Sequence, residues 1–290
     1  MNILINYADK NYKQAQCLNS WTGKILGKFD KVLSFGPDDI DIEFRNNHAD
    51  IFSYQRGNGL WLWKSYLINK VINESNDGDF VFYIDAGAFF IRDPRILLKY
   101  ITDVDPIFVT DIPLIECNFT KQECFDIIGG EEFKLTNQIQ AGIIIFKVNS
   151  FTRKFFKEYL DLCSNTTMLI PEELSKKEVP NKDYNYSLVA HREDQSILSL
   201  LCKVKGIKAH RDITNRGKDE FTFYNKHYAF LPVNHPDDTY PTILYLHKIG
   251  RFTLKSILAF LYGKLIYKFK YKKQRINHYK THYKSLQSCK

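Results

Sequence analysis

The chain has 290 residues and a mass of 34.1 kDa, about the size of one large α/β domain with appendages. Hydrophobic residues make up 44% and aromatic residues 15%, with only 14 Gly and 9 Pro, which excludes a disordered or fibrous protein. The net charge is +8, but eleven of the 41 Lys and Arg residues lie between Arg251 and Lys290, where there is no Asp or Glu. The first 250 residues are therefore slightly acidic, which disfavours a nucleic-acid partner, because nucleic-acid enzymes more often spread basic side chains over the folded domain.

The six cysteines lack the paired spacing of a zinc site or a disulfide scaffold. The N-terminal segment, Met1 to Tyr7, has no basic region ahead of an apolar one and is typical of a first strand, not of a signal peptide. No uncharged apolar run reaches the roughly 18 residues of a spanning helix. We expect a cytoplasmic protein from a reducing compartment.

Apolar runs and helical patterns alternate in chain order. The sequence predicts strands at 2–7, 31–37 (ending in a Gly-Pro turn), 79–84, 106–110, 141–147 and 243–247, and helices at 13–25, 61–73, 151–163 and 193–204. The polar stretch 164–187 is predicted to be a loop or lid over a site. Trp61, Trp63 and Tyr66 fit core packing better than a sugar-stacking platform. This alternation indicates an α/β fold with a mostly parallel sheet flanked by helices.

Polar residues follow several predicted strands, and ligands of open α/β sheets bind at the carboxyl ends of strands. These segments are Tyr7-Ala8-Asp9-Lys10-Asn11, Asp85-Ala86-Gly87, Gln140-Ala141-Gly142, and His247-Lys248 with Arg251. Taken singly, such an Asp can be a turn former or helix cap, and such a His a structural residue. Together, a carboxylate and an imidazole could hold a divalent ion, and the cations could neutralise a diphosphate.

The order of these motifs resembles the GT-A nucleotide-sugar glycosyltransferases, especially the bacterial lipopolysaccharide galactosyltransferase and glycogenin group. The motifs are Ala8–Tyr12, Tyr83–Asp85, Gln140–Ile144, Glu193–Leu198 and His247–Gly250. The segments Arg56–Lys64 and His191–Ser196 are similar to those of bacterial capsule and O-antigen glycosyltransferases. The resemblance predicts a glycosyltransferase domain over residues 1–250 and leaves a basic tail at 251–290.

The resemblance implies transfer of a galactose- or glucose-type hexose from a UDP-sugar to a saccharide or lipid-linked glycan during bacterial surface polysaccharide synthesis. It implies that the uracil and ribose bind Tyr7, Ala8, Asp9 and Asn11. It implies further donor contacts from Arg56, Lys64, Gln140, Gly142, Lys248 and Arg251, with Asp85 in the same donor site. Glu193, Asp194 and Gln195 correspond to the reaction centre.

The resemblance also implies a Mn²⁺ or Mg²⁺ ion that bridges the diphosphate, with Asp85 and His247 as ligands. The family motif is Asp-x-Asp, whereas this chain has Asp85-Ala86-Gly87, so one carboxylate is missing. Either water and diphosphate oxygens complete the coordination, or basic side chains take over and metal dependence is weakened. We expect the first arrangement, because hard cations accept water ligands.

Two further questions stay open at the level of the sequence. An inverting reaction would use Asp194 or Glu193 as general base on the acceptor hydroxyl, whereas in a retaining reaction Asp194 would orient the donor sugar. Glu193 and Asp194 could also merely favour the first turn of a helix through its dipole. The rival functions are a nucleotidyltransferase or sugar-phosphate enzyme, which would need more carboxylates beside Asp85, and a non-enzymatic binder of membranes or nucleic acid.

The tail combines an apolar helical stripe with a basic segment. Leu254, Ile257, Leu258, Leu261 and Leu265 recur at helical spacing, and five Lys and Arg residues follow between 268 and 275. A peripheral anchor on the anionic inner face of the cytoplasmic membrane is favoured over a docked, solvated helix.

Overall fold

The structure, a computed structural model, describes all residues except 172–187, 220–221, 224–230, 232, 269–271 and 278–290. Its centre is a six-stranded sheet in the order β2-β1-β3-β6-β5-β7. The strands are β1 (Asn2–Tyr7), β2 (Lys31–Phe35), β3 (Phe80–Ile84), β5 (Ile107–Ile115), β6 (Asn137–Lys147) and β7 (Ala209–His210). Only β6 among them runs against the others, since its pairings with β3 and β5 are antiparallel and the remaining pairings are parallel. The predicted mostly parallel α/β sheet is therefore confirmed.

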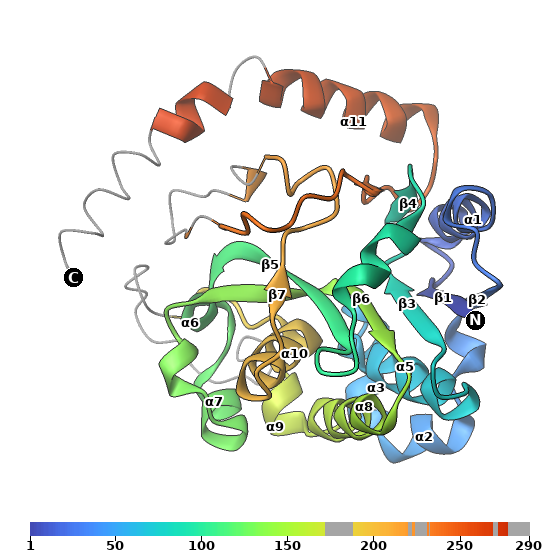
Figure 1. Ribbon diagram of the computed structural model, residues 1–290, viewed down its shortest axis with the longest axis vertical. Helices are drawn as coiled ribbons and strands as arrows, with labels where there is room; N and C mark the ends of the chain where they lie inside the picture. The colour runs from blue at the N-terminus through green and yellow to red at the C-terminus, as the bar shows by residue number, and fades with distance from the viewer. Residues whose placement is uncertain (172–187, 220–221, 224–230, 232, 269–271, 278–290) are drawn as a thin grey trace.

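Apolar side chains alternate between the two faces of the central strands and bury both. Ile3, Ile5 and Tyr83 belong to the core cluster on one face, whereas Leu4 and Phe82 belong to the cluster on the other. The first face is covered by α5 (Leu62–Glu74), α8 (Ser150–Cys163) and α10 (Glu193–Val204), which lie together below the sheet in Figure 1. The second face lies towards a two-stranded antiparallel sheet, β4 (Ala88–Phe90) with β8 (Leu244–Leu246).

The remaining described elements are short, apart from α1 and α11. They are α1 (Lys13–Thr22), α2 (Ile42–Asn47), α3 (Ala49–Phe52), α4 (Gly57–Leu60), α6 (Glu116–Phe119), α7 (Gln122–Ile128), α9 (Thr166–Leu169) and α11 (Leu254–Ile266), a π-helical turn η1 (Gly23–Gly27), and 3-10 turns η2 (Pro37–Asp39), η3 (Pro94–Tyr100) and η4 (Glu131–Phe133). No helix in the described part of the chain is both long enough and apolar enough to cross a bilayer.

The sequence predicts the main elements well and their ends less well. The helix predicted at 193–204 is α10, but the one predicted at 13–25 ends at Thr22 and continues as η1. The strands predicted at 106–110 and 141–147 are the longer β5 and β6, which pair with each other through a register shift. In the predicted loop, α9 occupies 166–169, and residues 172–187 lie outside the described residues.

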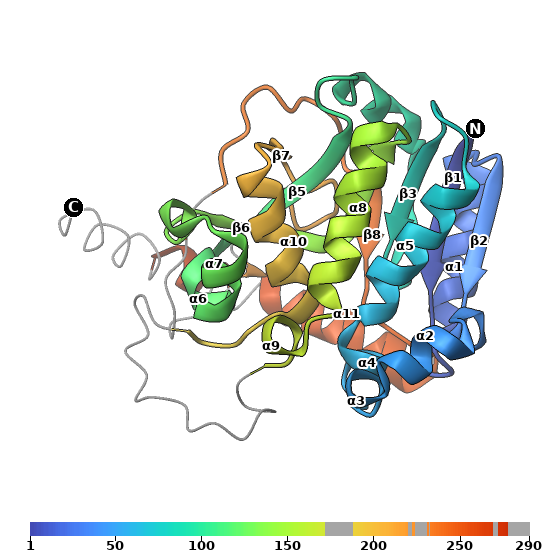
Figure 2. The ribbon, with the colours of Figure 1, turned by 90° about the horizontal axis from the view of Figure 1, so that it is seen from below.

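Several chain segments meet at one edge of the sheet and define the site. The parallel strands β1 and β3 both end there, at Tyr7 and Ile84. Antiparallel β6 passes the same edge at Gly142, whose carbonyl accepts a hydrogen bond from the Asp85 amide at 2.9 Å. The first turns of α5 and α10 also point to this edge (Figure 2). Residues far apart in sequence therefore surround one space.

Candidate active site

Two neighbouring pockets of about 380 Å³ each open at this edge, and both are lined by Asp85 and Trp61. The aromatic pocket is lined by Tyr7, Ala8, Asp9, Tyr12, Gln55, Gly57, Asn58, Trp61, Trp63, Asp85, Ala86, Gly87, Leu246 and Lys248. The polar pocket is lined by Arg56, Trp61, Lys64, Asp85, Ala141, Gly142, Ala190, His191, Arg192, Glu193, Asp194 and Gln195. Asp85 therefore stands where the two pockets join.

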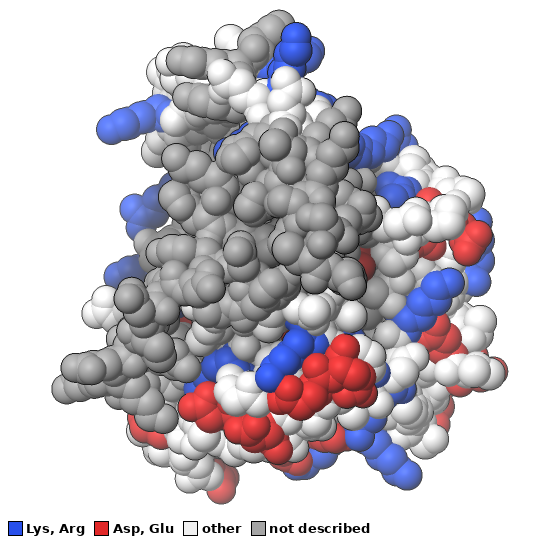
Figure 3. Space-filling view, turned by 90° about the vertical axis from the view of Figure 1, so that its left-hand side faces the viewer, with Lys and Arg blue, Asp and Glu red and all other residues white. Residues whose placement is uncertain are grey.

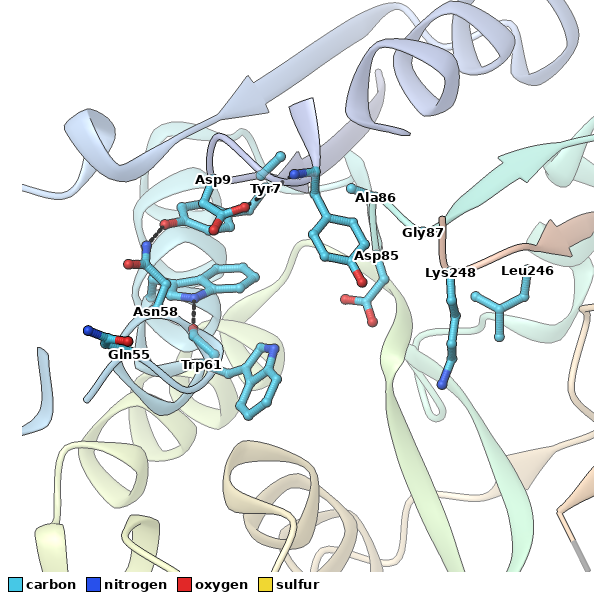
Figure 4. Close-up of a pocket in the computed structure, with 14 residues that line it drawn as sticks. Tyr7, Asp9, Gln55, Asn58, Trp61, Asp85, Ala86, Gly87, Leu246 and Lys248 are labelled. Carbon is cyan, nitrogen blue, oxygen red and sulfur yellow. Dashed lines mark hydrogen bonds between the residues drawn. The ribbon is translucent and has the colours of Figure 1, made fainter. Parts of the chain in front are cut away.

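The wall of the aromatic pocket is a stacked pair of rings (Figure 4). Tyr7 and Trp63 have ring centroids 3.7 Å apart and an interplanar angle of 18°. The Tyr7 hydroxyl accepts a hydrogen bond from the Asn58 side-chain amide, and burial raises the pKa of Tyr7 to about 12. Trp63 donates its indole N–H to the Gly57 carbonyl at 2.8 Å. This pocket offers flat apolar surface with amide and hydroxyl groups at its rim, which suits a nucleobase.

The turn that builds this wall is strained. Residues 57 to 61 all have positive φ, between 52° and 92°. Glycine adopts such angles freely, but Asn58, Leu60 and Trp61 do so at a cost. Of the six described non-glycine residues with positive φ, only Lys28 lies outside the two pockets and the 57–61 turn. Strain of this kind concentrates at functional sites.

The loop after β1 is held by its own polar side chains. The Asp9 carboxylate accepts hydrogen bonds from the backbone and side-chain amides of Asn11, both at 2.9 Å. Asn11 in turn accepts one from the Arg251 guanidinium at 3.3 Å. Tyr7, Ala8 and Asp9 line the aromatic pocket, whereas Asn11 and Arg251 line neither pocket and brace the loop instead.

Asp85 is fixed in place by its neighbours. The Tyr83 hydroxyl donates to Asp85 Oδ1 at 2.6 Å, and the Asp85 side chain is 47% exposed. A Cβ added at Gly142 would lie 2.8 Å from Asp85 Oδ2. Gly142 therefore provides the space that this carboxylate occupies.

A buried ion pair forms the floor of the polar pocket. Lys64 Nζ lies 2.7 Å from Asp194 Oδ2 and 4.0 Å from Asp85 Oδ1. The side chains of Lys64 and Asp194 are only 4% and 6% exposed, and the Tyr159 hydroxyl donates to Asp194 at 3.3 Å. Burial raises the pKa of Asp194, although the positive charge of Lys64 opposes this. Burial alone would lower the pKa of Lys64, but the negative charges of Asp194 and Asp85 outweigh it, so the pKa of Lys64 is raised.

The residues beside Asp194 are also engaged with protein partners. Glu193, whose φ is +41°, forms an ion pair with Arg56 at 2.7 Å. Gln195 donates its amide to Gln138 Oε1 at 2.7 Å. The predicted reaction-centre residues Glu193, Asp194 and Gln195 therefore all line one pocket. Gln140 lies outside both pockets and donates to Thr110 at 2.6 Å.

Lys248 and His247 differ in where they lie. Lys248 has a φ of +57° and lines the aromatic pocket, and Figure 4 shows its side chain reaching into the cavity. Lys248 is exposed overall, but partial burial of its ammonium in the pocket lowers its pKa. The positive charges of Arg216 and Arg192 lower this pKa further, whereas the negative charge of Asp85 raises it. His247 lines neither pocket, and its buried ring lies 5.8 Å from the Phe89 ring and 5.3 Å from that of Phe252.

The predicted metal ligands do not form a matching donor set. Within the described ranges, no three His, Cys, Asp or Glu side chains gather as a metal-binding group. His247 Nδ1 accepts a hydrogen bond from the Ile249 amide at 3.0 Å, so the neutral ring carries its proton on Nε2. That buried Nε2 is an N–H donor with no partner in the described residues, and it has no lone pair for a cation. Asp85 is the carboxylate that both pockets share, whereas Asp9 is engaged by Asn11, Glu193 by Arg56 and Asp194 by Lys64. The metal site therefore stays a prediction that these residues do not fit.

The sequence analysis assigned no role to several residues of the site: Asn58, Tyr83, Tyr159 and Gln138 position site residues through hydrogen bonds. Trp61, which was expected to pack in the core, is partly buried and lines both pockets. The Gly57-Asn58-Gly59 segment was the available signal, since two glycines beside a cation indicate an unusual turn. Trp63 and Tyr66 are buried in the core as expected, although Trp63 also lines the aromatic pocket.

Comparisons with known proteins give structural neighbours only. No protein-family model matches the sequence, and no protein of curated function matches it. Among solved structures, the chain is similar to mouse xyloside xylosyltransferase 1, with 7% identity, a TM-score of 0.45, and coverage of 87% of this chain and 100% of that one. It is similar to the galactosyltransferase LgtC, solved with donor and acceptor sugar analogues, with 15% identity, a TM-score of 0.44, and coverage of 91% and 96%. A third is the bifunctional glycosyltransferase WbbM, with 10% identity, a TM-score of 0.45, and coverage of 77% of this chain and 42% of that one.

All three neighbours are glycosyltransferases, the class that the sequence motifs resemble. With TM-scores of 0.44 to 0.45, these likenesses carry no conclusion about the chemistry of this chain. The chemistry of this chain is therefore inferred from its own two pockets.

Proposed function

We propose that the chain is a glycosyltransferase that moves a hexose from a UDP-sugar to a hydroxyl of a saccharide or lipid-linked glycan of a bacterial surface polysaccharide. The observation that carries this proposal is the pair of joined pockets with Asp85 at their junction. A nucleotide sugar is a linear ligand with a flat base and ribose at one end, a diphosphate in the middle and a hexose at the other. The aromatic pocket suits the nucleoside, and the polar pocket suits the sugar hydroxyls.

Each end of the donor would meet matching chemistry. The Tyr7–Trp63 wall offers stacking surface, and the Asn58 amide and Asp9 carboxylate offer hydrogen bonds to the base and ribose. In the polar pocket, Asp194 and Gln195 can accept and donate hydrogen bonds to hexose hydroxyls. Lys64, held between Asp194 and Asp85, fixes both carboxylates before substrate arrives, so little reorganisation is needed during the reaction.

The reaction breaks the bond between the anomeric carbon and the β-phosphate oxygen, and the electron pair stays on that oxygen. The acceptor hydroxyl oxygen bonds to the anomeric carbon, and its proton passes to the departing phosphate. Asp194 is buried and paired with Lys64, and Glu193 is paired with Arg56, so neither carboxylate is an available base. We therefore assign Asp194 the role of orienting the donor sugar, which supports retention of anomeric configuration.

Tryptophan fluorescence tests the nucleoside pocket directly. The chain has three tryptophans, of which Trp61 and Trp63 line the aromatic pocket and Trp21 is exposed on α1. Addition of UDP to the full chain should quench fluorescence, and the Trp61→Phe/Trp63→Phe variant, which retains Trp21, should show no change. Quenching that persists in this variant, or its absence in the wild type with all nucleoside diphosphates, would contradict the assignment.

We also propose that α11 binds an anionic membrane surface, the inner face of the cytoplasmic membrane in a bacterial cell. Leu254, Leu258, Leu261 and Leu265 occupy one side of α11 and are 75%, 55%, 55% and 57% exposed. The other side contacts the body, where Lys264 lies 4.3 Å from the centroid of the Tyr245 ring. Figure 3 shows Lys and Arg side chains scattered over the face, the α11 end included, whereas the largest acidic cluster of that face lies at the other end. An exposed leucine stripe with basic flanks suits insertion into the headgroup region and would bring a lipid-linked acceptor to the pockets.

A further inference from the structure

The charge that develops on the leaving group needs a counter-charge, and the residues around Asp85 show where it comes from. Departure of a nucleoside diphosphate adds negative charge to the phosphate oxygens. A divalent ion held by two or more protein ligands is one solution, but the two predicted ligands are the Asp85 carboxylate and the His247 imidazole, which presents an N–H. A set of fixed side-chain cations and N–H donors is the other solution.

Asp85 is poorly arranged to attract a divalent ion by itself. Its Oδ1 already accepts the Tyr83 hydroxyl and faces the Lys64 ammonium at 4.0 Å. Ala86 and Gly87 follow it and supply no second carboxylate. The nearest other carboxylate of the polar pocket, Asp194, is occupied by Lys64 at 2.7 Å. A Lys ammonium therefore lies between the two carboxylates that a metal would need.

Lys248 stands across the junction from these groups. Its ammonium reaches into the aromatic pocket, and it forms no ion pair within the described part of the chain. Arg192 lines the adjoining polar pocket. Arg216 belongs to a loop tied to β8, because the Asn215 side chain accepts a hydrogen bond from the Leu246 amide at 2.7 Å. The charges of both arginines lower the pKa of Lys248, but Arg216 lines neither of the two pockets, so Arg192 is the arginine that the lining places beside the junction.

We propose that this enzyme transfers sugar without a divalent metal, and that Lys248, supported by Arg192, supplies the positive charge that stabilises the departing diphosphate. The inference rests on the proposed function, since it names how that site handles its leaving group. In this arrangement Asp85 is not a metal ligand. Its negative charge lies at the junction of the two pockets and helps hold Lys64.

The two arrangements predict opposite effects of neutralising Asp85. If Asp85 held a metal, Asp85→Asn would abolish the metal-dependent binding of UDP. If side-chain cations bind the diphosphate directly, Asp85→Asn removes a repulsive charge, so UDP should bind as tightly as to the wild type or more tightly. UDP carries no hexose, so this measurement does not depend on contacts in the polar pocket.

The experiment is calorimetric titration of UDP into the full chain, once in EDTA and once in Mn²⁺. The wild type is compared with Asp85→Asn and Lys248→Met. The control is Lys24→Met, since Lys24 is an exposed residue of η1. We expect the wild-type affinity to change less than about 2-fold between the two buffers, and Lys248→Met to weaken it at least about 10-fold in both, because a charge-assisted contact is lost. Lys24→Met should bind like the wild type. Electron paramagnetic resonance of Mn²⁺ mixed with the chain alone should show no bound ion.

Binding of UDP that requires Mn²⁺, with loss in Asp85→Asn and no effect of Lys248→Met, would overturn the inference and leave the proposed function intact. Absence of binding by UDP and by the other nucleoside diphosphates in either buffer would instead remove the proposed function, and the inference with it. Because Lys248 is exposed, its variant should keep the wild-type melting temperature, which separates a binding defect from misfolding.

Discussion

The ammonium of Lys64 lies 2.7 Å from the carboxylate of Asp194, and both side chains are almost completely buried at the floor of the polar pocket. An ion pair in such a position is costly to bury, and it persists only when each charge compensates the other. The Lys64 ammonium also lies 4.0 Å from the carboxylate of Asp85, so Lys64 links the end of β3 to the start of α10.

Removing one member of this pair should destabilise the protein more than removing both. Lys64→Met leaves Asp194 buried without its cation and should lower the free energy of unfolding by about 3–5 kcal/mol. The double variant Lys64→Met/Asp194→Asn should recover about 1–3 kcal/mol of that loss. Urea denaturation of the wild type, both single variants and the double variant measures the coupling. Additive effects would show that the pair is not a coupled unit. Sugar transfer should remain lost in the double variant, because the groups that orient the donor are gone.

Gly142→Ala tests the fixed position of Asp85. The added Cβ would lie 2.8 Å from Asp85 Oδ2 and 3.3 Å from its Cγ, so the carboxylate must move. We expect the free energy of unfolding of Gly142→Ala to fall by about 1–3 kcal/mol. We also expect its kcat/KM for the donor to fall well below that of the wild type when both proteins are folded. Gly263→Ala is the control, because nothing lies within 4 Å of its Cβ position and alanine is favoured in a helix. Full activity in Gly142→Ala would show that the position of Asp85 is unimportant.

Stability should fall in mild acid because of His191, which lines the polar pocket and is fully buried. Burial, with a smaller effect of Lys121, lowers its pKa from 6.5 to about 3. The unfolded chain takes up a proton near pH 6.5, whereas the folded imidazole stays neutral down to about pH 3. The free energy of unfolding therefore decreases as the pH falls through this window, by up to about 1.4 kcal/mol per pH unit from this group. Denaturation of the wild type and His191→Gln between about pH 4.5 and 6.5 should show a shallower slope in the variant, and equal slopes would refute the assignment.

Much of this arrangement could be predicted from the sequence, and the reasons are local. The strand ending at Asp85 is a continuous apolar run, and α10 begins at the acidic pair Glu193-Asp194, so both were predictable. Lys64 and Asp194 were each candidates, but their pairing depends on how α5 and α10 pack, which no local pattern encodes. His247 shows the same limit: the sequence gives its position after β8, whereas the hydrogen bond from the Ile249 amide decides which ring nitrogen carries the proton.

The membrane proposal predicts a selective effect of the leucine stripe. Leu258→Ser/Leu261→Ser/Leu265→Ser should reduce cosedimentation with vesicles that contain phosphatidylglycerol by at least about 10-fold, because three exposed apolar side chains lose their burial in lipid. Ile25→Ser/Ile42→Ser/Val104→Ser, which removes exposed apolar side chains of the body, should bind like the wild type. Raised salt should weaken binding, since the basic residues contribute through screened attraction. Equal binding to neutral vesicles, or an unaffected triple leucine variant, would contradict the anchor.

The central claim is tested most directly by release of UDP from a panel of UDP-hexoses, measured on the full chain with sugar acceptors and compared with Asp194→Asn under conditions where both are folded. The two-pocket site predicts turnover of at least one UDP-hexose, a loss of about 100-fold or more in the variant, and a glycosidic product that keeps the anomeric configuration of the donor by NMR. If no UDP-hexose is turned over, or if Asp194→Asn releases UDP at the wild-type rate, the pockets do not form a glycosyltransferase site of the kind described.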